Sequence, residues 1–537
     1  MKRLPTTLAV ALCACALLAG QDHHHSGPIP KLGAISFPVS CSKPAQNRIE
    51  HGLALLHSFL FDDAEAEFQA AATEDSTCAM AFWAEAIGLY RPLAYRPGDA
   101  DVKRGWELIQ QAQALDAKTP RERDYINAAA AFYRADVPNH GRDYDTRNHE
   151  YSTTLEKLYK AYPNDPEAAV FYALSLLTFA DSQDPVADSE KAIAILTPIF
   201  RDNPNHPGVA HYLIHAADSP QLAPKGLEAA RRYAQIAPAA PHALHMPSHI
   251  FARLGLWQDD INSNLASIAA SRKTAAMHMG GEGHQFHAMD FLVYAYLQSG
   301  READAQRVID EVKAMPAKKD DMYGMDFDPR TDALITFGAR YALEMHHWTE
   351  AASLELIPGA ETGDHSITYW ARAIGAARSG NLPDARKDVA EIDTIHATLL
   401  KQKKTSFAES VEQDRQEAAA WVAHAEGNND EAIKTLRTIA EKEEAEGDEP
   451  LAIPAREMLA DMMLDMNRPE QALAEYEADL KFNPNRFNGL YGAARAAEMA
   501  GKSDKSNSYY ARLVKICDGS NSDRPELSRA KSLLAQK

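Results

Sequence analysis

Two pairs of histidines in this sequence repeat one another at a fixed distance. His211 and His215 form one pair, and His245 and His249 form the other. Corresponding members are 34 residues apart. Residues at i and i+4 lie one turn apart on the same face of a helix. Because imidazole nitrogens bind Zn, Cu, Fe and Ni, two such faces side by side predict a transition-metal site.

The region around the two pairs is rich in histidine. Three interpretations stay open from the residues alone: a metal site, a metal-free polar groove that binds a ligand, and buried histidines with satisfied hydrogen bonds. The span 206–290 holds nine of the 21 histidines of the chain, namely His206, His211, His215, His242, His245, His249, His278, His284 and His287.

The elements that position these histidines are predicted to be helices. From about Gln46 onward, apolar residues recur at i, i+3, i+4 and i+7, and no convincing strand is found. Short stretches rich in Pro, Asn, Asp and Gly separate the apolar runs. Pro-containing breaks are expected at 161–166, 201–207, 235–238 and 481–485, and tight turns at Gly300, Gly380, Gly427, Asn467 and Gly501.

This alternation of breaks and turns resembles the tetratricopeptide repeat (TPR), a helix-turn-helix unit of 34 residues. The resemblance implies an all-α, tetratricopeptide-type helical hairpin solenoid, wound as a right-handed superhelix with a concave groove. The run His-Met-Pro-Ser-His-Ile from His245 to Ile250 is also similar to a motif of exported bacterial TPR proteins. That group implies a fold and no reaction.

The resemblance assigns positions to the histidines. With Gly255 and Gly300 as turn glycines, the histidines fall on the first helix of each unit, which faces the groove in this family. His287 and Asp290 fall on the first helix of the next unit. One metal site is therefore expected, and its candidate ligands are His211, His215, His245, His249, His287 and Asp290.

Residues near the candidate ligands are expected to support them or to line the groove. A ligand histidine needs a hydrogen-bond partner on its other ring nitrogen. Pro247 is a complication, because proline is comfortable only at the first position of a helix and would leave His245 on an irregular entry segment. The supporting candidates are His242, Asp218, Asn264 and Tyr294.

The charge of the chain restricts the kinds of partner that it is expected to bind. A formal net charge of −20 argues against a nucleic-acid surface, which needs clustered Lys and Arg. The expected partner in the groove is a protein, a peptide or a small ligand. No segment after the N-terminus reaches the ~18 apolar residues of a transmembrane span.

The N-terminus reads as an export signal. Lys2 and Arg3 precede a short apolar run, and cleavage after residue 20 would suit it. The same run fits a lipoprotein signal with Cys15 as the lipidated residue, so simple secretion and a lipid anchor both stay open. Either alternative places the chain in the periplasm or cell envelope, where a disulfide between Cys41 and Cys78 could form.

The predicted organisation follows from these signals. Its divisions are a signal peptide at 1–20, a flexible His- and Pro-rich lead-in at 21–44, TPR-like helices with an irregular insert at 45–200, His-rich units at 201–315 and C-terminal units at 316–537. The expected function is binding of a ligand or protein partner in the groove, with one transition-metal ion (Zn, Cu or Fe) at the histidines. The alternative is a metal-dependent hydrolase or oxidoreductase on the same scaffold.

Overall fold

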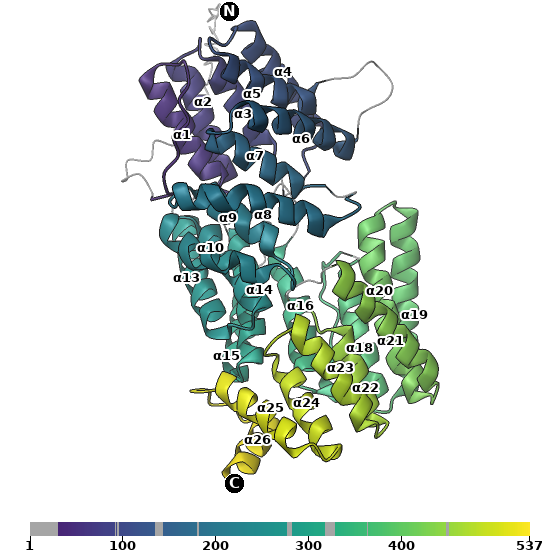
Figure 1. The fold of residues 1–537 in the computed structure, drawn as a ribbon. Coiled ribbons are helices and arrows are strands. Elements are labelled where there is room, and N and C mark those ends of the chain that lie inside the picture. The colour runs from purple at the N-terminus through teal and green to yellow at the C-terminus, as the bar shows by residue number, and fades with distance from the viewer. Residues whose placement is uncertain are drawn as a thin grey trace, which may run out of the picture.

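The structure, a computed structural model, is built from helices joined by turns and loops (Figure 1). No strand occurs among the residues that it describes, so the prediction of an all-α chain is confirmed. The expected signal segment at 1–20 and His278 lie outside the described residues. These comprise residues 31–91, 93, 96–134, 143–179, 182–276, 282–316, 328–361, 363–446 and 451–536.

The helices of the N-terminal half pack as hairpins of chain neighbours. The two helices of a hairpin contact each other, and the second of them contacts the first helix of the following hairpin, which produces a stack of repeats. The hairpins are α1 (Lys43–Leu56) with α2 (Phe61–Glu74), α3 (Ala79–Leu89) with α4 (Asp99–Ala114), α5 (Pro120–Tyr133) with α6 (Tyr144–Ala161), and α7 (Pro166–Leu176) with α8 (Pro185–Asp202).

The central, histidine-rich repeats continue this stack. The first helix of the middle repeat is divided into two short helices, and the other repeats have undivided ones. The hairpins are α9 (Pro207–Ala217) with α10 (Ala223–Ile236), α11 (Pro241–His245) and α12 (Pro247–Arg253) with α13 (Trp257–Ala276), and α14 (Glu282–Gln298) with α15 (Glu302–Ala314).

The C-terminal repeats have the same pattern and end in a single helix. The hairpins are α16 (Pro329–Glu344) with α17 (Trp348–Ala351), α18 (His365–Arg378) with α19 (Leu382–Lys401), α20 (Thr405–Ala425) with α21 (Asn429–Glu446), α22 (Ala455–Asp465) with α23 (Pro469–Phe482), and α24 (Phe487–Met499) with α25 (Ser503–Ile516), followed by α26 (Pro525–Ala535).

The predicted breaks and turns delimit these helices. The four Pro-containing breaks each separate one hairpin from the next. The predicted turn residues adopt the left-handed conformation, which ends a helix and lets the chain reverse. Positive φ angles occur at Gly300 (65°), Gly380 (86°), Gly427 (88°), Asn467 (57°) and Gly501 (72°).

Pro247 divides the first helix of the middle repeat, as its position in the sequence predicted. It is the first residue of α12, and α11 ends at His245. Met246 between them still has helical angles, φ −49° and ψ −34°. His245 is therefore the last residue of a helical turn, and not part of an irregular entry segment.

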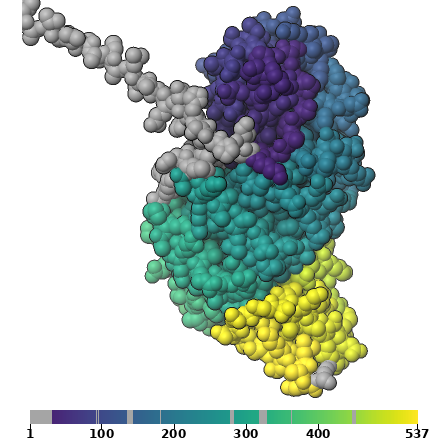
Figure 2. All heavy atoms as spheres, turned by 90° about the vertical axis from the view of Figure 1, so that its left-hand side faces the viewer, coloured from purple at the N-terminus to yellow at the C-terminus, as the bar shows by residue number. Residues whose placement is uncertain are grey.

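The C-terminal repeats fold back onto the histidine-rich ones. The indole Nε1 of Trp257 donates a hydrogen bond to the backbone oxygen of Asn485 (2.8 Å), and α14 packs against α24. Gly255, with φ +62°, lies against the backbone of Pro484, where a Cβ atom would clash. The superhelix thus turns far enough for its C-terminal part to contact its middle, and Figure 2 shows the yellow C-terminal helices directly against the teal central repeats.

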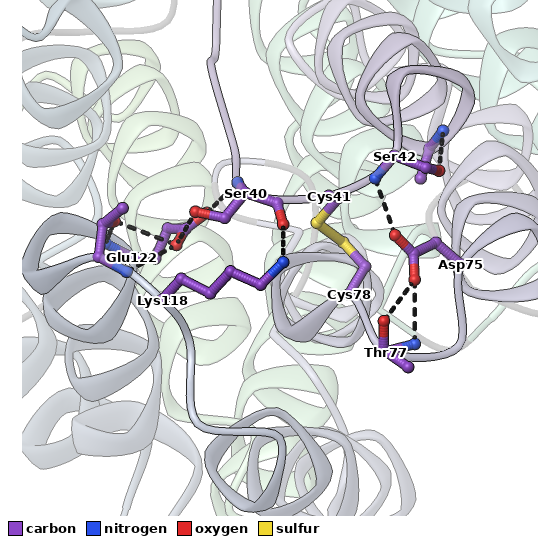
Figure 3. The surroundings of a disulfide bond; sticks show 10 residues. Ser40, Cys41, Ser42, Asp75, Thr77, Cys78, Lys118 and Glu122 are labelled. Atoms are coloured by element: carbon purple, nitrogen blue, oxygen red, sulfur yellow. Dashed lines mark hydrogen bonds between the residues drawn. A yellow bond between two sulfur atoms is a disulfide. The ribbon is translucent and has the colours of Figure 1, made fainter.

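The described part of the lead-in, residues 31–42, is packed onto the repeats. Phe37 is fully buried between Trp83 and Tyr125. A disulfide joins Cys41 to Cys78 at the start of α3, as the sequence suggested (Figure 3). The flexible lead-in expected for 21–44 is therefore wrong for 31–42, because this strap carries apolar side chains that it buries.

Among the described helices, none combines the length and apolar character needed to cross a membrane.

Candidate metal centre

Six histidines from the central repeats form two clusters. We call the first cluster 1 (His211, His215 and His242) and the second cluster 2 (His245, His249 and His287). In each cluster, one ring nitrogen per histidine lies within 4.8 Å of the other two. In cluster 1, Nε2 of His211 lies 3.0 Å from Nε2 of His242 and 3.0 Å from Nε2 of His215.

The two clusters are built to one plan. Each uses an i, i+4 pair from the first helix of one repeat: His211 and His215 on α9, and His245 and His249 across α11 and α12. Each is completed by a histidine near the start of the next first helix. This third member is His242 on α11 for cluster 1 and His287 on α14 for cluster 2.

A buried hydrogen-bond network on the inner side of cluster 1 supports the His211 ring. Nδ1 of His211 donates to the backbone oxygen of His57 (2.8 Å), in the turn between α1 and α2. The His57 ring is fixed in turn, because its Nε2 donates to Glu167 (3.0 Å) and its Nδ1 is hydrogen-bonded to the Tyr212 hydroxyl (2.9 Å). His206 donates to the second Glu167 oxygen (2.8 Å). The network thereby sets the orientation of the His211 ring.

Cluster 2 has polar supports from neighbouring helices. Nδ1 of His245 donates to the Oδ1 atom of Asn264 (2.7 Å), which α13 contributes. Nδ1 of His249 donates to Oδ2 of Asp218 (2.7 Å), and Arg253 donates to the other oxygen of that carboxylate (3.0 Å). Asn264 and Asp218 are two of the residues expected to support the ligands.

These partners fix the protons of two cluster 2 rings. Asp218 is an ionised carboxylate that only accepts, so His249 carries its proton on Nδ1. Asn264 donates its own amide to the backbone oxygen of Asp260 (3.1 Å), so its Oδ1 faces His245 and that ring is also protonated on Nδ1. When both rings are neutral, both Nε2 atoms present lone pairs, and they lie 3.0 Å apart. Two lone pairs this close repel unless a cation lies between them.

Burial favours the neutral form of five of the six cluster rings. Burial, aided by neighbouring imidazoles, holds the pKa of His211, His242 and His245 far below the ordinary value. It lowers the pKa of His215 and of His287 to about 3. Neutral imidazole is the form that binds a metal.

Asp218 supplies the negative charge beside cluster 2. Burial alone would raise its pKa, but the neighbouring His249 and Arg253 outweigh this effect and hold the pKa well below its usual range. The carboxylate therefore stays ionised and keeps accepting from His249. A carboxylate on the outer nitrogen makes the imidazole a stronger metal ligand.

One phenylalanine packs against each cluster. The ring of Phe59 is stacked on His242 at 4.7 Å and meets His211 edge-on at 4.5 Å. Phe291 lies 4.5 Å from His249 and 4.9 Å from His245. Phe59 has φ +57°, a strained angle for a residue with a side chain. Phe59 thus has a strained backbone, and its ring packs over cluster 1.

Two of the expected site residues lie outside the clusters. Asp290 forms an ion pair with Arg340 and is not among the converging atoms, so neither cluster contains the expected carboxylate ligand. Tyr294 accepts a hydrogen bond from Arg486 and contacts no cluster ring. His242, expected to play a supporting part, instead joins cluster 1. The sequence could have indicated this role, because His242 occupies the same repeat position as His287, which was an expected ligand.

Comparisons with known proteins return no family and only distantly similar solved structures. No protein-family model matches the chain, and no curated protein matches it. One solved structure with distant similarity to this chain is the Naa15/Naa10 complex bound to HypK-THB (10% identity, covering 92% of this chain and 91% of that one, TM-score 0.24). Another is a human IFIT1 dimer with m7Gppp-AAAA (14% identity, covering 82% of this chain and 90% of that one, TM-score 0.33). A third is the APC/C hetero-tetramer Cut9-Hcn1 (11%, 91% and 90%, TM-score 0.32). At this distance the fold class rests on the helix hairpins themselves.

Proposed function

We propose that this protein is an exported helical-repeat metalloprotein that binds transition metal through the histidines of its central repeats. The observation that carries the proposal is the pair of Nε2 atoms of His245 and His249, 3.0 Å apart with both outer nitrogens already donating. A metal ion between them turns lone-pair repulsion into coordination. A shared proton is the competing cation, and the metal content of the purified protein distinguishes the two.

The types of donor atom restrict which metals suit the clusters. Both clusters offer imidazole alone, without a carboxylate, among the atoms that converge. Neutral nitrogen donors suit Cu and Zn, whereas Mg and Ca prefer oxygen. We therefore propose copper or zinc ahead of iron.

A ligand would approach the histidines from one side. His215, His249 and His287 are partly exposed, whereas the other three rings are buried; we call the exposed trio the open side. Three protein ligands per ion leave a coordination position free, as in catalytic metal sites. A small molecule or peptide in the groove would reach the ions here.

Export agrees with the disulfide. A Cys41–Cys78 bond persists in an oxidising compartment such as the periplasm and is rare in the cytosol. Cell fractionation, with the N-terminus of the mature chain read by mass spectrometry, tests export. It also separates simple secretion from lipidation at Cys15.

Metal content tests the proposed function. Purified, tag-free protein from medium with added Zn, Cu and Fe should hold at least one transition-metal ion per chain. A variant that lacks both pairs (His211→Ala, His215→Ala, His245→Ala and His249→Ala) should hold none, while His347→Ala/His396→Ala, away from the clusters, should keep the full content. Metal-free wild-type protein would refute the proposal.

A further inference from the structure

The six clustered histidines are too many and too widely spread for one ion. A metal with bonds of ~2.0–2.1 Å holds donor atoms no more than about 4 Å apart. The donors of each cluster lie within 4.8 Å of one another, so small side-chain movements would bring them to this spacing. The atoms of the two clusters do not merge into one such group. Each cluster therefore has the donors for its own ion.

The two clusters are nevertheless neighbours. The rings of His215 and His249 are 6.5 Å apart between centroids, and those of His242 and His245 are 6.2 Å apart. These gaps between clusters match the 6.3 Å between His215 and His242 within cluster 1. Ions held by the two clusters would therefore be neighbours, as the paired ions of two-metal sites are.

Resting on the proposed metal binding, we infer that clusters 1 and 2 form one dinuclear centre whose two ions share a small bridging anion on the open side. His215 of cluster 1 and His249 of cluster 2 both belong to that side and face each other across the gap. Phe59 and Phe291 flank the two clusters. The free position of each ion thus lies toward the same space.

Charge explains why the bridge is an anion. Every donor in the two clusters is a neutral imidazole, so two divalent ions would keep their full charge and repel one another strongly at this distance. Asp218 offsets part of this charge through His249 alone. Hydroxide or another small anion between the ions offsets the rest, and azide serves as its probe.

Copper(II) tests the inference, because two coupled copper ions differ magnetically from two separate ones. The mature chain is loaded with Cu(II), its copper is counted by mass spectrometry, and its spins are integrated by electron paramagnetic resonance with and without azide. We expect two coppers per chain, with fewer than two spins or a half-field line, and a further change on azide.

Single-cluster variants provide the control. His211→Ala/His215→Ala and His245→Ala/His249→Ala should each hold one copper with one full spin and no half-field line. His215→Gln and His287→Gln, at partly exposed positions, replace them if a double variant does not fold. One copper per wild-type chain, or two full spins with no half-field line and no azide effect, would overturn the dinuclear centre but leave metal binding standing. No copper, zinc or iron at all would overturn both.

Discussion

The Nδ1 atom of His249 lies 2.7 Å from Oδ2 of Asp218, so the carboxylate holds the imidazole with its Nε2 atom toward cluster 2. The two residues come from neighbouring repeats, since Asp218 follows α9 and His249 belongs to α12. A contact between repeats therefore orients a candidate metal ligand. The orientation of His249 at the site thus depends on how these two repeats stack.

Asp218→Asn is expected to weaken metal binding without removing a ligand. The amide keeps the shape of the side chain but loses the charge that strengthens the His249 ligand, and changes of this kind cost roughly 10–100-fold in affinity. Competition with a chelator of known affinity measures the loss. Asp259→Asn, at an exposed acid on the repeat of His249, should leave affinity unchanged; equal affinities of all three proteins would contradict this account of Asp218.

Gly208→Ala is expected to disturb the network behind cluster 1. A Cβ atom at this position would lie 2.8 Å from Cγ of the buried His57 ring, which has no room to move. Overpacking of this kind typically costs ~1–3 kcal/mol of unfolding free energy. Urea unfolding measures the change, and chelator competition should show weaker metal binding as His57 shifts.

Gly338→Ala is the matched control for that exchange. Its Cβ would meet only the end of Leu354 at 4.0 Å, so it should be neutral or stabilising by up to about 1 kcal/mol through its helix propensity. If Gly208→Ala proved as stable as Gly338→Ala, the His57 ring would not be confined as described.

The Cys41–Cys78 disulfide is expected to stabilise the N-terminal repeats. It closes a loop between residues 37 positions apart, for which chain entropy gives about 4 kcal/mol. Cys41→Ser/Cys78→Ser should lower the thermal midpoint of the N-terminal repeats and loosen the strap at 31–42, as followed by hydrogen exchange. Reductant should lower the wild-type midpoint and leave that of the variant unchanged; insensitivity of the wild type would show that the bond is not formed.

The metal-free protein is expected to lose stability in mild acid. The pKa of His215 and of His287 falls to about 3 in the folded chain, against about 6.5 when unfolded. Below pH 6.5 the unfolded chain binds more protons, so this contribution to stability is complete above pH 6.5 and declines toward pH 3. Urea midpoints between pH 8 and 5 should fall less steeply in His215→Gln/His287→Gln. Parallel curves would contradict the neutral state of these two rings in the folded chain.

The fold was predictable because its signals are local. The Pro-containing breaks and the turn residues, such as Gly300 and Asn467, each act over a few positions, and they delimit the helices as expected. The 34-residue spacing likewise brought His211 and His245 into corresponding places on successive first helices. Repeats make such long-range statements possible, since one unit predicts the next.

The site was less predictable because its partners come from distant parts of the chain. The backbone oxygen that accepts from His211 belongs to His57, and the carboxylate that fixes His57 belongs to Glu167. Asp290 resembled a ligand by position, but Arg340, 50 residues later, pairs with it. No pattern within one repeat contains these contacts, so the sequence alone gave one expected site where the structure has two clusters.

Anomalous diffraction from crystals of the mature protein, grown with copper or zinc and measured at the absorption edge of that metal, tests the central claim most directly. The account predicts a peak among the Nε2 atoms of His211, His215 and His242, and another among those of His245, His249 and His287. Absence of a peak from both clusters in metal-replete crystals would contradict it.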